Sequence, residues 1–171
     1  MKIKNYLWTM LTTVMAVVVS ISFVACGDDD DGGDNSKTVT ENDPPGTIIA
    51  NLTNTFYHDA KYGYNGITIM GHYSHNLGMN ELNNLEVHNW NGDYVIVSLG
   101  KVKGLSNIKK VPESGWTKQV AAVPGFGYIF RMGTEQYQYA RIYAVDYMTS
   151  TTGGIMGITI KYQENWKPDD K

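Results

Sequence analysis

The sequence of 171 residues contains a single cysteine, Cys26. A structural disulfide within the chain needs two cysteines, so this fold must be stable without one. Long stretches with helical spacing of apolar residues are also missing, which argues against a helical bundle. From residue 44 onward the chain carries 11 basic and 10 acidic side chains. This near-neutral balance lacks the basic field that attracts nucleic acid, so we expect no nucleic-acid partner.

Recognisable catalytic and cofactor motifs are scarce as well. The chain has no Gly-x-Ser-x-Gly elbow, and the Ser-x-x-Lys match at Ser106 lacks its companion motifs. Gly125-Phe-Gly127 lacks the third glycine of a dinucleotide turn. His72 and His75 are three residues apart, which places two side chains on opposite faces of a strand. We therefore expect no cofactor and no metal site, with surface histidines as the simpler interpretation.

Residues 1–25 have the order of a secretory signal peptide. Lys2 and Lys4 form the charged start, an apolar run follows, and the small residue Ala25 precedes the cysteine. A transmembrane helix is the alternative, because the apolar run is nearly long enough to span a bilayer. Threonine and serine residues interrupt the run, however, and no basic stop-transfer cluster follows it. These features favour a cleaved leader.

Residues 26–43 consist of Cys26 and an acidic segment that opens with Gly27 and four aspartates. This composition is too polar and too rich in glycine to bury a core, and it predicts a disordered tether. A calcium loop is the alternative, but the aspartate spacing puts glycines at ligand positions of an EF-hand. The segment therefore favours a spacer between Cys26 and the folded domain.

Phe23-Val-Ala-Cys26 resembles a bacterial lipobox, with phenylalanine where leucine is more common. The resemblance implies cleavage before Cys26 and lipid attachment to its sulfur, which anchors a protein to a membrane without spanning it. The acidic segment resembles the export signal of surface lipoproteins of the Bacteroidota. This second resemblance implies anchoring in the outer membrane with the domain facing the cell exterior. A purely solvating linker is the alternative for the acidic segment.

Residues 44–171 are enough for one domain of ordinary size. Their alternating patterns predict a mainly β fold with little helix, built as an antiparallel β-sandwich, roll or open barrel. The last three strands are expected to form a meander, Asn91-Gly92 to close a hairpin, and residues 105–109 to form a short helical turn. The predicted strands cover residues 47–52, 67–73, 85–90, 94–99, 127–132, 137–148 and 155–162.

The strand at 137–148 carries the candidate site. Tyr137, Tyr139, Arg141 and Tyr143 fall on one face, and such an aromatic face can stack on sugar rings or contact a protein. The alternative is that these side chains fill a second core or form cross-strand pairs. Alternation places Asp146 on the opposite, core face, where Arg131 would be its partner. Asp146 is then either half of a structural ion pair or a catalytic acid.

The sequence from Leu99 onward resembles a family of small Bacteroidota lipoproteins of unknown function. The resemblance rests on Leu99-Gly-Lys-Val-Lys-Gly-Leu105, Gly115-Trp116, Val123-Pro-Gly-Phe-Gly-Tyr-Ile129 and Tyr139-Ala-Arg-Ile-Tyr-Ala-Val-Asp-Tyr147, and it implies no activity and no site residue. The missing catalytic motifs favour a non-enzymatic binding or accessory module for a glycan or an envelope protein. A small hydrolase acting on an envelope or dietary polymer and a structural assembly subunit are the alternatives.

Overall fold

The computed structural model describes residues 38–55, 66–71, 76–88 and 93–169. The predicted leader, Cys26, His72 and His75 lie outside the described residues, as does the tether up to residue 37. Within the described part, no helix is long and apolar enough to cross a membrane.

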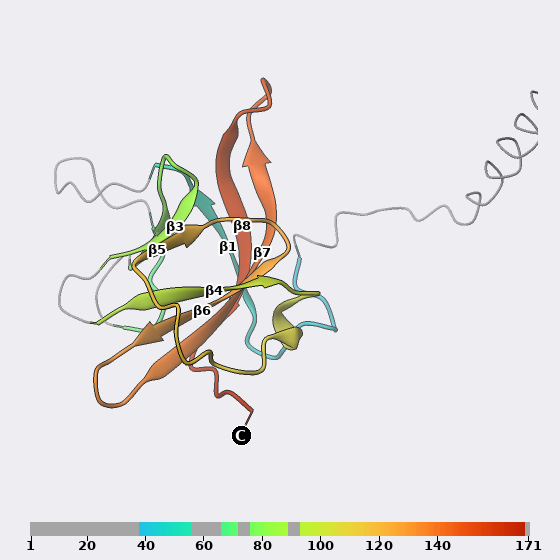
Figure 1. Ribbon diagram of the computed structural model, residues 1–171. Coiled ribbons are helices and arrows are strands. Elements are labelled where there is room, and N and C mark those ends of the chain that lie inside the picture. The colour runs from blue at the N-terminus through green and yellow to red at the C-terminus, as the bar shows by residue number, and fades with distance from the viewer. Residues whose placement is uncertain (1–37, 56–65, 72–75, 89–92, 170–171) are drawn as a thin grey trace, which may run out of the picture. The chain divides into compact units, whose positions relative to one another are not determined.

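The prediction of a mainly β, antiparallel fold is confirmed, and the described strands form two open sheets rather than a closed barrel. The larger sheet has the strand order β1-β8-β7-β6-β4, and the smaller has the order β2-β3-β5. Figure 1 shows the smaller sheet lying across the larger one. The strands of the larger sheet are β1 (Ile48–Thr53), β4 (Val95–Lys101), β6 (Phe126–Met132), β7 (Gln138–Thr149) and β8 (Ile155–Gln163); those of the smaller are β2 (Leu77–Met79), β3 (Asn84–Val87) and β5 (Gln119–Ala121).

The predicted meander is present as β6, β7 and β8, with β7 in the centre. Phe130 pairs with Ala140, and Ala144 pairs with Ile160, so apolar side chains of the three strands share one face. The helical turn expected at 105–109 is a single 3-10 turn, η2 (Leu105–Asn107). Local alternation was therefore a reliable guide to the C-terminal half of the fold.

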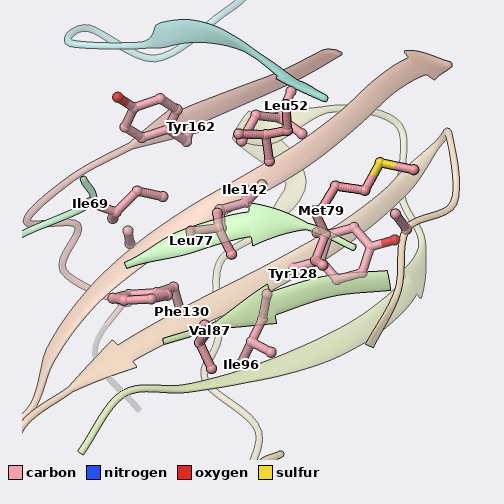
Figure 2. Close-up of a cluster of buried hydrophobic side chains, with 14 of the residues drawn as sticks. Leu52, Ile69, Leu77, Met79, Val87, Ile96, Tyr128, Phe130, Ile142 and Tyr162 are labelled. Atoms are coloured by element: carbon pink, nitrogen blue, oxygen red, sulfur yellow. The ribbon is translucent and has the colours of Figure 1, made fainter. Parts of the chain in front are cut away.

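The main core fills the space between the two sheets. Leu77 and Met79 of β2 point toward Tyr128 and Ile142 of the larger sheet (Figure 2). All four residues have an exposed fraction of 0%. Burying an aliphatic side chain of this size contributes roughly 1.5–3 kcal/mol, so packing between the sheets is the main source of stability.

A second apolar cluster covers the opposite face of the larger sheet. Val97 of β4 and Ile129 of β6 pack there against η2 and Trp166. Gly127 permits this close approach, because a Cβ atom at that position would lie 2.9 Å from Ile108 Cδ1. The larger sheet is thus buried on both faces, by a sheet on one side and by irregular chain on the other.

Asn91 and Gly92 lie outside the described residues, but the pairing predicted for the two strands that flank them is wrong. β3 pairs with β2 and β5, whereas β4 pairs with β6, so the chain passes from one sheet to the other between β3 and β4. The hairpin in this region instead joins β2 to β3, where the Asn80 side-chain oxygen accepts hydrogen bonds from the backbone N–H groups of Leu82 and Asn84. Asn83 adopts a positive φ of 58° in the same turn, which asparagine tolerates.

The strand predicted at 67–73 is also wrong over its described part. Only Ile67 forms a bridge, with Leu77. Ile69 is held by the Asn76 side chain, which accepts from its N–H at 2.7 Å and donates to its carbonyl at 2.6 Å. Met70 then takes a positive φ of 44°. A side-chain amide therefore satisfies backbone groups that a neighbouring strand would otherwise satisfy.

The placement of Asp146 in the core is wrong as well. The β7–β8 register shifts between Ala144 and Asp146, and this bulge inverts the alternation. Asp146 is exposed, while Tyr147 turns inward and donates to the Ala122 carbonyl at 2.7 Å. Arg131 pairs with Tyr139, seven residues from Asp146, or about 23 Å along an extended strand. The predicted ion pair is absent, because Arg131 of β6 lies beside the start of β7 and Asp146 lies near the end of β7.

Tyr128 supports a test of the main core. Its hydroxyl accepts from Val123 N–H and donates to the Ala121 carbonyl, both at 2.8 Å. Tyr128→Phe should lower the free energy of unfolding by about 1–3 kcal/mol, because both backbone groups lose their partner. Urea titration measures this difference, and Tyr137→Phe, at a side chain that is 47% exposed, is the matched control. Equal effects of the two substitutions would contradict the assigned hydrogen bonds.

The dependence of stability on alkaline pH should distinguish the Tyr128→Phe protein from the Tyr137→Phe control. Burial raises the pKa of the Tyr128 hydroxyl from its ordinary value of 10.0 to about 12. Because the folded pKa exceeds the unfolded one, this contribution to stability is complete below about pH 10 and is lost as pH rises toward 12. The free energy of unfolding of Tyr128→Phe should lack this part of the decline between about pH 10 and 12. If urea titrations show the same decline for Tyr128→Phe and Tyr137→Phe, this assignment is contradicted.

Candidate functional site

The predicted ligand face lies on the outer side of β7, opposite the main core. The four side chains occupy different surroundings along it. Tyr137, just before β7, is 47% exposed, Tyr139 and Tyr143 are half-buried and pack against the second cluster, and Arg141 lies between these two. The row is therefore not one open surface, and its residues belong to two separate hollows.

Arg141 separates the two hollows because it is occupied by structural contacts. Its Nε donates to Gln163 Oε1 at 2.8 Å, and its Nη1 donates to the Ile108 carbonyl at 2.9 Å. The guanidinium carbon lies 5.5 Å from the centroid of the Trp166 ring. Burial lowers the pKa of Arg141, an effect that Asp169 partly opposes. An arginine nonetheless stays charged, so the residue acts as a fixed cationic support.

Tyr137 is held by a second cationic contact. The Arg131 guanidinium carbon lies 4.4 Å from the centroid of Tyr137 and 4.4 Å from that of Trp116. Tyr139 lies beside Tyr137, with ring centroids 6.3 Å apart. Each cation–π contact of this kind contributes about 0.5–2 kcal/mol. The exposed Tyr137 ring is therefore held in place by Arg131, which in turn contacts Trp116.

An open groove of about 260 Å³ lies beside these rings. We call it the aromatic groove. The C-terminal segment forms its second wall, docked by a 2.9 Å hydrogen bond from Trp166 N–H to the Tyr139 carbonyl. The groove combines aromatic rings with side-chain amides and one lysine. Its lining residues are Tyr137, Gln138, Tyr139, Asn165, Trp166, Lys167 and Pro168.

Residues 40–47, which we call the strap, cross the outer face near β8. Two successive turns shape it, and in the second the Pro44 carbonyl accepts from the Thr47 N–H at 3.1 Å. The Pro45 carbonyl accepts from Gln163 Nε2 at 2.8 Å, and Asp43 forms a 2.8 Å ion pair with Lys161 of β8. The strap is thus attached to the sheet at two points.

The Asp43–Lys161 pair is largely buried, with side-chain exposures of 10% and 7%. Burial raises the pKa of the Asp43 carboxyl, but hydrogen bonds from Lys161 and Thr40 outweigh it, so the net pKa lies below the ordinary 3.8. Asp43 is therefore ionised at neutral pH, and the stabilisation from this pair is lost only when the pH falls below about 4. Composition alone had assigned Asp43 to the acidic tether.

A larger hollow of about 390 Å³ lies between the strap, η2 and β7. We call it the strap pocket. Its volume falls within the roughly 300–1,000 Å³ that is usual for small-molecule sites. Tyr143 is the predicted site residue that it contains. The lining residues are Thr40, Asn42, Asp43, Lys103, Gly104, Leu105, Ser106, Asn107, Tyr143, Val145 and Lys161.

Chemistry by a metal or by paired carboxylates has little support in the described part of the chain. No group of three or more histidine, cysteine or acidic side chains is placed there to hold a metal ion. Asp146 is exposed, and its Oδ1 accepts from the Tyr147 N–H at 2.8 Å. Comparison of the chain with protein-family models, curated proteins and solved structures gives no match. Functional inference therefore rests on the two hollows.

Several residues that shape or support the two hollows are not among the predicted site residues. Trp116 contacts Arg131 and Trp166 contacts Arg141, both from irregular segments. Asp43 belongs to a stretch whose composition predicts a solvated tether. Lys161 follows the alternation of its strand, sharing the polar positions with Gly157 and Thr159, so the pattern alone places it on the outer face of the sheet. A lysine in the middle of a buried sheet needs a partner, and an aspartate was the chemistry to look for.

A double-mutant cycle tests the support of Tyr137. Trp116→Leu and Arg131→Met remove the ring and the charge while keeping apolar bulk. We expect a coupling free energy of about 0.5–2 kcal/mol between the two positions in urea unfolding. The same cycle between Arg131 and the distant Leu82 should give additive effects. Additivity within about 0.5 kcal/mol for the Trp116 pair would show that the contact contributes no stability.

Proposed function

We propose that this protein is a non-enzymatic, surface-displayed binding module that holds a glycan chain in the aromatic groove. The observation that carries the proposal is the exposed Tyr137 ring, fixed by Arg131 at the edge of a groove lined with aromatic and amide side chains. Aromatic rings offer rigid apolar faces for the C–H faces of a sugar, and amides supply directional hydrogen bonds. A groove of this small volume suits one part of an extended chain rather than an enclosed ligand.

Preorganisation supports the same proposal. Binding costs less when the contacting side chains are already ordered, and the contacts of Arg131 order Tyr137 before any ligand arrives. Tyr139 is packed against the second cluster, so it is likewise fixed. Trp166 is only 7% exposed and contributes a wall rather than a free stacking surface. Tyr137 is therefore the residue on which glycan stacking depends most.

A neighbouring envelope protein is the second candidate ligand. Tryptophan, tyrosine and arginine are the residue types that dominate binding energy at protein interfaces, and Trp116, Arg131 and Tyr137 meet at one place. The hydrolase alternative loses the observation that motivated it, since Asp146 is exposed rather than buried. A structural assembly subunit would differ from both candidates by forming concentration-dependent oligomers without ligand.

Surface display has a direct test in intact cells. If the chain is anchored at Cys26 and faces outward, protease added to whole cells should remove the domain, whereas a periplasmic marker protein should survive. Substitution Cys26→Ser should release or mislocalise the protein, because the lipid attachment is lost. Survival of the domain until the cells are lysed would contradict display on the exterior.

Glycan binding is tested by calorimetric titration of the full-length protein, purified in detergent, with maltoheptaose, xylohexaose, cellohexaose and chitohexaose. We expect at least one oligosaccharide to bind, and Tyr137→Ala to weaken it about 5- to 10-fold through loss of ring stacking. Tyr137→Phe keeps the ring and should retain most of the affinity.

Leu82→Ala is the control for a general loss of exposed apolar surface, because Leu82 is 79% exposed on the β2–β3 turn. The Leu82→Ala protein should bind the oligosaccharide with the same affinity as the unmodified protein. If Tyr137→Ala binds as tightly as Tyr137→Phe, the groove is not the glycan site. If no oligosaccharide binds, the glycan proposal fails and the envelope-protein candidate takes its place.

A further inference from the structure

The strap pocket gathers polar side chains that the protein itself does not use. Among the described residues, the side chains of Asn42, Lys103 and Ser106 form no hydrogen bond with another part of the chain, although all three line the pocket. Polar groups that converge on one hollow from separate segments are the usual means of orienting a small ligand. The pocket thus has unused donors and acceptors on more than one wall.

Lys161 adds a buried cation to these groups. Its side chain is 93% buried, with an exposed fraction of 7%, and it lines the same pocket. An ammonium group has three N–H donors, and within the described part of the chain only Asp43 accepts from it. A buried ammonium with unused donors favours a further acceptor, because a desolvated donor without a partner is costly.

The charge balance indicates which acceptor fits. Asp43 neutralises Lys161, and Lys103 is the remaining charge of the pocket, so an empty pocket carries one net positive charge. The surrounding segment from Lys101 to Lys110 holds four lysines and no acidic residue, and all four lysines are exposed. Only Lys103 of these four lines the pocket, but a local excess of positive charge around a concave site attracts anions.

We propose that the strap pocket binds the carboxylate-bearing ring of an acidic sugar. The carboxylate pairs with Lys103 and accepts from the unused donors of Lys161. The sugar hydroxyls bond to Asn42, Ser106 and the Tyr143 hydroxyl. A hollow of about 390 Å³ with both a cation and neutral hydrogen-bonding groups suits a charged, polyhydroxylated ring better than a bare inorganic anion. The pocket is separate from the aromatic groove, so this inference does not depend on the glycan proposal made for that groove.

A ligand in this position would join the strap to η2. Asn42 belongs to the strap, Ser106 belongs to η2, and Lys161 belongs to β8 between them. Binding should therefore slow hydrogen exchange of the strap amides as well as those of η2. This readout separates a ligand inside the pocket from one that merely contacts the exposed lysines.

The test is a calorimetric titration of the full-length protein, purified in detergent, with sodium glucuronate, glucose and inorganic phosphate. We expect glucuronate to bind more tightly than glucose or phosphate, and Lys103→Ala to weaken it about tenfold or more, since a charge-assisted hydrogen bond is lost. Lys101→Ala is the matched control, because Lys101 is an exposed lysine of the same segment that does not line the pocket. It should change the affinity by less than about twofold. Exchange measured with saturating glucuronate should show protection of the strap amides at residues 40–43, 46 and 47.

The opposing outcomes are equally specific. No binding of glucuronate, or equal binding to the Lys103→Ala protein, would overturn the proposal. Equal affinity for glucose would remove the role of the carboxylate, and equal affinity for phosphate would reduce the pocket to a general anion site; either result rejects an acidic-sugar site. Oligosaccharide binding that Tyr137→Ala weakens while glucuronate binding is unchanged would show that the two sites are independent.

Discussion

The central strand β7 is packed on both faces, and most of the structure is arranged to cover it. The smaller sheet covers the face that carries Ala140 and Ile142. The opposite face has no second sheet, and irregular chain from the strap, the η2 region and the C-terminal segment covers it instead. Irregular backbone cannot satisfy its own polar groups as a sheet does. Arg141 compensates by donating to the Ile108 carbonyl and, through Gln163, by holding the strap at Pro45.

This arrangement explains where the two hollows lie. Loops laid over a sheet leave gaps where one segment ends and the next begins, whereas two stacked sheets interdigitate and leave few. The aromatic groove lies where the start of β7 meets the C-terminal segment, and the strap pocket lies where the strap meets η2. Both hollows therefore lie on the irregularly covered face, and the main core contributes stability.

Much of the C-terminal half could be predicted from sequence, because alternation with a period of two residues is a local signal. The strands β6, β7 and β8 follow it closely. β2 and β5 have three residues each, which is too short to show a period. Asn91-Gly92 predicted a hairpin because turn propensity is local, whereas the choice between two sheets depends on distant packing. One inserted residue at the bulge after Ala144 was enough to invert the predicted environments of Asp146 and Tyr147.

The candidate site was predictable only in part. Alternation selected Tyr137, Tyr139 and Tyr143 correctly as neighbours on one side of β7, but it could not show that Arg141 divides them. The contacts that shape both hollows join residues far apart in the chain, such as Asp43 with Lys161, separated by 118 positions. No composition rule links such positions. Charge runs near a predicted boundary can therefore hide one residue that belongs to the folded domain.

The strap also determines how the domain responds to mechanical force. Any pull on the chain before Thr40 reaches the sheet first through the Asp43–Lys161 ion pair and the Pro45–Gln163 hydrogen bond, and only then through β1. β1 is an edge strand whose hydrogen bonds to β8 would open one after another if it were peeled from its first residue. The strap places two side-chain contacts ahead of that point. A pull on the N-terminal side of the domain would thus act on β8, one strand in from the edge, before it acts on the edge strand β1.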